Sequence, residues 1–286
     1  MKKYLLSLAV ILCVSCEKAD FSKFVDPVDE PNVILHLSKY EQEPFSRAAS
    51  DISEVCSRVN VAIFNADGSK VKTAAQKAGD DGYGTVAFAL TPSTYKVVVM
   101  AHNGEGSATI TSVDRVTFPN NKVTDTFYYY GDLVVGEEPQ TYDLVLTRAV
   151  AMFRWVMTDE DIPNDVVRMK FYYVGGSSTF SPQAGFGCVQ SKQTEYRSVE
   201  AGNMTFDLYT LPHTETDVIT RLTATALDAN DNVVSERVME DIPVTRNRIT
   251  TYTGPFFTEG VSEVASGNVI RMTANPAWDG NETFTY

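Results

Sequence analysis

Apolar and polar residues alternate with a period of two along most of this chain. In the first such run Val33, Leu35 and Leu37 fall on one face, and the residues between them fall on the other. This period is typical of β-strands that are buried on one side. Similar runs or short apolar runs recur at residues 59–64, 84–90, 95–101, 127–130, 142–146, 151–157, 167–174, 204–209, 219–227, 233–239, 249–252 and 269–274. The pattern predicts an all-β protein.

Turn-forming residues separate these runs. Asp67-Gly68 follows the run at 59–64 and predicts a hairpin. Residues 228–232 carry alternating oxygen-bearing side chains, as calcium loops do, but Val233 stands where an EF-hand needs glycine. We therefore interpret 228–232 as a second hairpin turn. Residues 71–77 and 159–166 have short helical leanings, and the acidic trio at 159–161 fits a solvated loop.

The number and spacing of these strands favour β-sandwiches. A chain of 286 residues suits two domains of ordinary size. We predict an N-terminal sandwich at 32–147, which begins with a leader strand at 32–39, and a C-terminal sandwich at 148–286. The boundary is expected near Thr147 and Arg148. Residues 16–31 are polar and contain two X-Pro pairs, so they are expected to form a flexible tether.

The start of the chain has the layout of a secretory signal peptide. Lys2 and Lys3 precede an apolar run at 4–14, and Ser15 stands before Cys16. The run is too short to cross a bilayer, which takes about 20 apolar residues. Residues 13–16 resemble a bacterial lipobox, although Cys13 stands where leucine is usual. This predicts a signal peptide at 1–15 and a lipid on Cys16; the alternative is an ordinary signal peptide with an incidental cysteine.

Charge and cysteine content narrow the function classes. The chain has 37 acidic and 24 basic residues and a net charge of −13. Nucleic-acid binding requires concentrated Lys and Arg, so this balance argues against it. The negative net charge suits a protein that stays soluble on an exposed cell surface. Cys56 and Cys188 remain beyond the lipobox, and we do not expect a disulfide because they fall in different predicted domains.

Catalytic and metal-binding motifs are missing from the sequence. Its three histidines, His36, His102 and His213, are far apart, and no zinc pattern, nucleophile elbow or phosphate loop occurs. We predict neither an enzyme nor a cofactor. Aromatic runs at 127–130 and 171–173 fit strands with alternate rings in the core; the alternative is a sugar-stacking platform that includes Tyr128, Tyr130 and Tyr172.

Several short stretches occur in an order that resembles one known family. They are Ser46-Arg47-Ala48, VNVAIFNADG at 59–68, YKVVVMAHNGEG at 95–106, LTRAVAMF at 146–153, VTRNR at 244–248 with TYTG at 251–254, and AWDG at 277–280. Together they are similar to the Bacteroidales type V fimbrillins and their FimB/Mfa-type accessory and anchor relatives. The likeness covers nearly the whole chain after the signal peptide, although each stretch is short.

The resemblance implies a fold and an assembly mechanism. It implies two tandem transthyretin-like β-sandwich domains, export as a lipoprotein to the outer membrane surface, and assembly with other fimbrial subunits by strand addition. Val33, Leu35 and Leu37 would fill a groove until a protease cut between Arg47 and Ala48. The tail at 268–286 would then donate a strand to the next subunit, with four candidate pocket-filling residues: Ile270, Met272, Trp278 and Phe284.

Two questions stay open at this point. A subunit that keeps the lipid on Cys16 and skips the cut would serve as a fimbrial anchor, whereas a cut subunit would join the fibre. The alternative function is a surface-exposed lipoprotein that binds glycans.

Overall fold

The computed structural model describes residues 30–40, 52–200, 204–258 and 280–285, with side chains described except at 38–40 and 280–285. Nearly all regular structure in these ranges is β-strand, so the predicted all-β class is confirmed. The short helices are α1 (Ile52–Val55) and the 3-10 turn η2 (Pro119–Asn121). In the described part of the chain, no helix has the length and apolarity to span a bilayer.

The first unit contains seven main strands. They are β1 (Val33–Tyr40), β2 (Arg58–Phe64), β3 (Lys70–Lys77), β4 (Thr85–Phe88), β5 (Ser93–His102), β8 (Thr126–Val135) and β9 (Gln140–Arg148). Their order in one continuous sheet is β3-β2-β5-β8-β9-β1-β4. The sheet folds over on itself, because one apolar cluster joins Val59 and Val97 from one part to Leu35 and Leu144 from the other.

The second unit also contains seven main strands. They are β10 (Ala151–Met157), β11 (Arg168–Gly175), β14 (Lys192–Ser198), β15 (Thr205–Thr210), β16 (Thr216–Leu227), β17 (Val233–Thr245) and β18 (Arg248–Gly254). Their sheets have the orders β14-β11-β16-β17 and β15-β10-β18-β19, where β19 (Gly280–Thr285) is the last strand of the chain. A second apolar cluster, which includes Trp155, Phe171 and Phe206, lies between them.

The two units repeat one topology. In each unit the first main strand lies between the fourth and the seventh, and the other four follow the order third, second, fifth, sixth. The first strand is antiparallel to the fourth and parallel to the seventh in both units. The two units share this connectivity although their residues differ.

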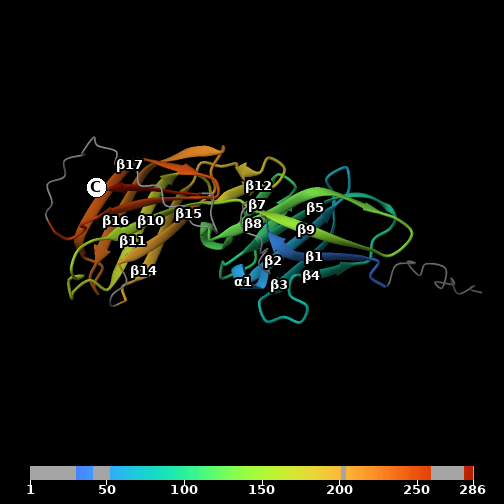
Figure 1. The fold of residues 1–286 in the computed structure, drawn as a ribbon, viewed down its shortest axis with the longest axis horizontal. Coiled ribbons are helices and arrows are strands. Elements are labelled where there is room, and N and C mark those ends of the chain that lie inside the picture. The colour runs from blue at the N-terminus through green and yellow to red at the C-terminus, as the bar shows by residue number, and fades with distance from the viewer. Residues whose placement is uncertain (1–29, 41–51, 201–203, 259–279, 286) are drawn as a thin grey trace, which may run out of the picture.

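A third sheet and a third core connect the units. The small sheet joins β6 (Thr109–Ser112) and β7 (Arg115–Thr117) to β12 (Thr179–Ser181) and β13 (Phe186–Gly187). Figure 1 shows the two units at opposite ends of the molecule, with β7 and β12 between them. Phe64 and Met100 from the first unit share an apolar cluster with Met152, Phe180 and Ile249 from the second. The units are therefore packed together rather than only linked by the chain.

Arg148 is the main polar residue of this junction. Its guanidinium donates to both carboxylate oxygens of Asp125, at 2.9 and 3.1 Å, and to Oδ1 of Asn247 in the second unit, at 2.9 Å. It also lies over the ring of Phe127, 4.6 Å from its centroid. Only 6% of Arg148 is exposed. Its charge is therefore matched inside the junction by a bidentate ion pair.

The local predictions have mixed outcomes. The Asp67-Gly68 hairpin is confirmed: β2 pairs with β3, and Gly68 has a φ of +84°. The turn at 228–232 is also confirmed, with Asp228 Oδ1 accepting from the N–H groups of Asn230 and Asn232. The helical expectation for 71–77 is wrong, because these residues form β3 against β2. Residues 159–166 form turns and irregular structure, because Pro163 interrupts any helix there.

Arg148→Met tests the junction. We expect it to lower the free energy of unfolding by about 3–5 kcal/mol, because it leaves Asp125 largely buried and without its cation. The control Lys96→Met removes the exposed Lys96–Asp132 pair and should cost at most about 1 kcal/mol. Urea unfolding of both variants gives the measurement, and equal effects would contradict a special role for Arg148.

We expect His102 to make the stability of the fold sensitive to mild acid. Burial, with a smaller effect of Arg58, lowers the pKa of His102 from 6.5 to about 4. The unfolded chain therefore binds more protons between these values, and stability falls as the pH drops from 6.5 to 4, by up to about 1.4 kcal/mol per pH unit. His102→Gln should flatten this slope in urea titrations at several pH values. An unchanged slope would show that His102 is not responsible.

Candidate functional site

The first strand of the chain occupies an interior position in its sheet. β1 pairs antiparallel with β4, with Val33 opposite Phe88, and parallel with β9, with Val33 opposite Gln140. A register shift interrupts the β9 pairing between His36 and Lys39. Both long edges of β1 are therefore hydrogen-bonded, although the strand lies at the start of the described chain.

The side chains of β1 follow the predicted alternation. Val33, Leu35 and Leu37 have no exposed surface and belong to the first apolar core, whereas Ile34 and His36 are half-buried. Burying one such side chain contributes about 1.5–3 kcal/mol. The three residues together make β1 a substantial part of this core.

Asn32 fixes the start of the strand. Its Nδ2 donates to the carbonyl oxygen of Leu90 at 2.8 Å, and its Oδ1 accepts from the Leu90 N–H at 2.9 Å. This reciprocal pair adds to the main-chain bonds from Asn32 to Phe88 and from Gln140 to Asn32. The sequence analysis missed this role; the available signal was an asparagine directly before an alternating run.

Most of the other predicted site residues lie outside the described residues. These are Cys16, Arg47, Ala48, Ile270, Met272 and Trp278. Phe284 lies in β19, where only the backbone is described. Of the predicted sites, only the set of Val33, Leu35 and Leu37 is brought together with described side chains.

The C-terminal strand lies at the edge of a second-unit sheet. β19 runs parallel to β18, with Arg248 opposite Gly280 and Thr253 opposite Thr285. It is the outer member of the order β15-β10-β18-β19. The end of the chain is therefore able to pair as an extended strand.

Asp159 holds the segment that follows β18. Its carboxylate accepts from the N–H groups of Phe256, Phe257 and Thr258, at 2.5, 2.9 and 3.0 Å, and from the Thr258 hydroxyl at 2.9 Å. Burial alone would raise the pKa of Asp159, but these donors together lower it below its ordinary value. The sequence suggested that Asp159 lies in a solvated loop. In the structure its carboxylate instead binds the backbone of residues 256–258.

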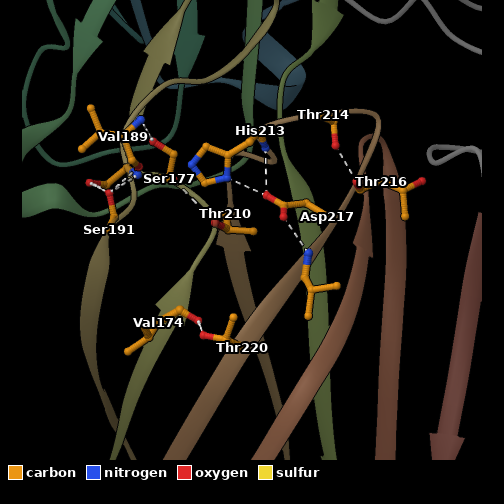
Figure 2. Close-up of polar contacts among 12 residues, drawn as sticks. Val174, Ser177, Val189, Ser191, Thr210, His213, Thr214, Thr216, Asp217 and Thr220 are labelled. Atoms are coloured by element: carbon orange, nitrogen blue, oxygen red, sulfur yellow. Dashed lines mark hydrogen bonds and ion pairs between the residues drawn. The ribbon is translucent and has the colours of Figure 1, made fainter.

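A cluster of polar side chains surrounds His213 in the second unit. Figure 2 shows His213 joined to Asp217, with Ser177 nearby. Oδ2 of Asp217 lies 2.7 Å from His213 Nδ1 and accepts from the His213 N–H at 2.9 Å. The Ser177 hydroxyl is fully buried, donates to the Thr179 carbonyl at 2.6 Å and accepts from the N–H groups of Thr179 and Val189. A serine nucleophile needs a hydrogen bond from its hydroxyl to a general base such as histidine. The Ser177 hydroxyl is bonded instead to the backbone of Thr179 and Val189. These contacts therefore stabilise turns.

The remaining chemical candidates are three tyrosines and two cysteines. Tyr128, Tyr130 and Tyr172 are half-buried, and the first two pack against the junction core. Cys56 is buried in the first core and Cys188 is exposed, and both are free thiols. Within the described ranges, no group of three His, Cys, Asp or Glu residues is arranged to hold a metal ion.

Comparison with known proteins identifies the family. A model for a family of unknown function, DUF6562, matches residues 27–285. The chain belongs to the DUF6562 family. No curated protein matches the DUF6562 chain significantly.

Solved structures that resemble the DUF6562 chain come from Bacteroides and Porphyromonas species. A candidate adhesin from Bacteroides ovatus is 17% identical to the DUF6562 chain, with coverage of 80% of this chain and 88% of the other, at a TM-score of 0.49. A candidate polysaccharide-binding protein from Bacteroides thetaiotaomicron is 13% identical, with coverage of 72% and 80%, at a TM-score of 0.48. The fimbrial anchor protein Mfa2 from Porphyromonas gingivalis is 13% identical, with coverage of 72% and 80%, at a TM-score of 0.41.

The sequence resembles Bacteroidales fimbrial proteins, and several of the similar solved structures are described as adhesins or as fimbrial anchor or assembly proteins.

Leu35→Ala tests the contribution of β1 to the first core. We expect a loss of about 2–5 kcal/mol in the free energy of unfolding, because a fully buried leucine leaves a cavity. Ile34→Ala is the matched control on the other face of the strand and should cost about 1 kcal/mol or less. Urea unfolding measures both, and a larger loss for Ile34→Ala would contradict the assigned faces.

Proposed function

We propose that this chain is a lipid-modified fimbrial subunit or fimbrial anchor, assembled by β-strand addition on the outer membrane surface. The observation that carries the proposal is the position of β1. It is the first strand of the first unit, yet it lies between β4 and β9 with its apolar side chains in the core. Because β1 is the first strand of its unit, a cut between β1 and β2 would allow it to be exchanged without unthreading the other strands of the unit.

The groove that β1 occupies has the properties that strand addition requires. Without β1, the facing edges of β4 and β9 would lose their hydrogen-bond partners, and the core around Val86 and Leu144 would be opened. Such an edge binds an extended segment with apolar residues at alternate positions. Val33, Leu35 and Leu37 satisfy this requirement in the uncut chain.

Release of β1 would require a cut between β1 and β2. Arg47-Ala48 lies in this connection, upstream of α1. Cleavage there would leave β1 attached to the first unit only by non-covalent contacts, and its departure would carry away the lipid on Cys16. A fimbrial anchor would keep the lipid and remain uncut.

The tail at 268–286 is the proposed donor to a neighbouring subunit. Support comes from the parallel pairing of β19 with β18, which has the same relative direction as the pairing of β1 with β9. Ile270, Met272, Trp278 and Phe284 would supply the apolar side chains. We also propose that the two units are transthyretin-like domains, on the basis of their repeated strand order.

A second candidate function is a surface lipoprotein that binds glycans. It is favoured by a polar depression on the outer face of the second unit, lined in part by Arg168, Lys170 and Tyr196. Adhesion and fibre assembly use different surfaces in this arrangement, so one protein is able to do both.

Arg47→Ala tests the processing step in the native cell. We expect wild-type protein in fibres to begin at Ala48, and Arg47→Ala protein to stay longer by residues 16–47, keep its lipid on Cys16 and fail to enter fibres. The measurement is intact-protein mass spectrometry of surface protein, together with immunoblots of sheared fibres. Arg115→Ala, at an exposed arginine of β7, is the control and should behave as wild type.

Two outcomes separate the alternatives. Wild-type protein that retains the lipid and residues 16–47 at the base of fibres would assign the anchor role. Normal fibres and an unchanged N-terminus in the Arg47→Ala strain would refute cleavage at this position.

A further inference from the structure

The outer face of the sheet β14-β11-β16-β17 carries a depression of about 600 Å³. This volume falls in the range of small-ligand sites, roughly 300–1,000 Å³. Four strands and one hairpin turn contribute to its wall. The lining residues are Arg168, Lys170, Tyr196, Thr225, Leu227, Asp231, Val233 and Glu236.

The sheet register places the central residues in one row. Lys170 on β11 lies opposite Tyr196 on β14 and opposite Thr225 on β16, which in turn lies opposite Glu236 on β17. They face away from the core, because the neighbouring β11 residues Met169 and Phe171 are buried in it. The row is thus a continuous outward-facing strip across all four strands.

A second row completes the depression. Arg168 lies opposite Leu227, and Leu227 lies opposite Val233. Arg168 forms an ion pair with Asp231 of the hairpin turn and lies over the Tyr196 ring, 5.6 Å from its centroid. Leu227 and Thr225 are only 5% and 6% exposed, so they form the floor. Arg168 therefore contacts both the hairpin turn and the aromatic ring at the edge of the depression.

The polar groups of the depression are mixed in kind. Lys170 supplies donors and forms no ion pair with any described residue. Glu236 supplies acceptors and holds the Thr225 hydroxyl at 3.0 Å. Arg168 and Asp231 add one further charge of each sign. A phosphate or a free carboxylate would meet two acidic side chains here, and a cation would meet two basic ones.

The apolar component is an exposed aromatic ring. Tyr196 is 55% exposed, which is high for a large side chain on a sheet. Sugar hydroxyls both donate and accept hydrogen bonds, whereas the C–H face of a sugar ring is apolar. A charge-balanced set of donors and acceptors beside an exposed tyrosine matches both features.

We propose that this depression binds an uncharged sugar unit of a glycan, with its apolar face on Tyr196 and its hydroxyls bonded to Lys170 and Glu236. The proposal deepens the second candidate function and is independent of strand addition. The site is on the second unit, whereas the groove of β1 is on the first, so a failure of one leaves the other untouched.

The test uses the purified full chain on a printed array of neutral and acidic oligosaccharides, followed by titration calorimetry with the best neutral oligosaccharide. Tyr196→Ala should weaken binding about tenfold or more, as truncation of a central aromatic anchor commonly does. Tyr196→Phe keeps the ring and should remain within about threefold of wild type. Lys170→Ala should also weaken binding, because it removes the donor in the central row.

Val238→Ala is the matched control, because Val238 is exposed on β17 but does not line the depression. It should bind as wild type, and urea unfolding should show that all variants are folded. The proposal is overturned if no neutral oligosaccharide binds, if only acidic ones bind, or if Tyr196→Ala binds as tightly as Val238→Ala. Fibre formation by Tyr196→Ala cells is expected to be normal, which keeps this result separate from strand addition.

Discussion

The enclosure of β1 between β4 and β9 is the interaction on which the first unit depends. β1 supplies main-chain partners to two other strands and places Val33, Leu35 and Leu37 in the first core. β1 is the first main strand of the unit and is paired on both edges. The first unit is therefore closed by its own first strand.

The second unit shows why this position matters. There β10 occupies the same place, antiparallel to β15 and parallel to β18. β10, however, follows β9 after Ala149 and Val150 and continues into the sandwich, so it is tied at both ends. Arg148, bonded to Asp125 and Asn247, and the shared junction core hold it further. The topology is thus the same in both units, but the two first strands differ in their connections: β10 follows directly from the first unit, whereas β1 precedes it.

The sequence predicted the strands better than their partners. Period-two alternation located β1 and its buried face because one side of a sheet in a sandwich is apolar, and that requirement is local. The same local rule failed at residues 71–77, where edge strand β3 exposes most of its side chains and its alternation is weak. Asn32 and Asp159 were missed because their partners, Leu90 and residues 256–258, lie far away along the chain.

By itself, the sequence determined that the protein is all-β, acidic and built from many short strands. Those properties follow from composition and from neighbours along the chain. Only the tertiary structure decided that β1 is interior, that two units share one strand order, and that Tyr196, Lys170 and Glu236 form a row. Strand order and register depend on hydrogen bonds between residues that are distant in sequence, and no local pattern encodes them.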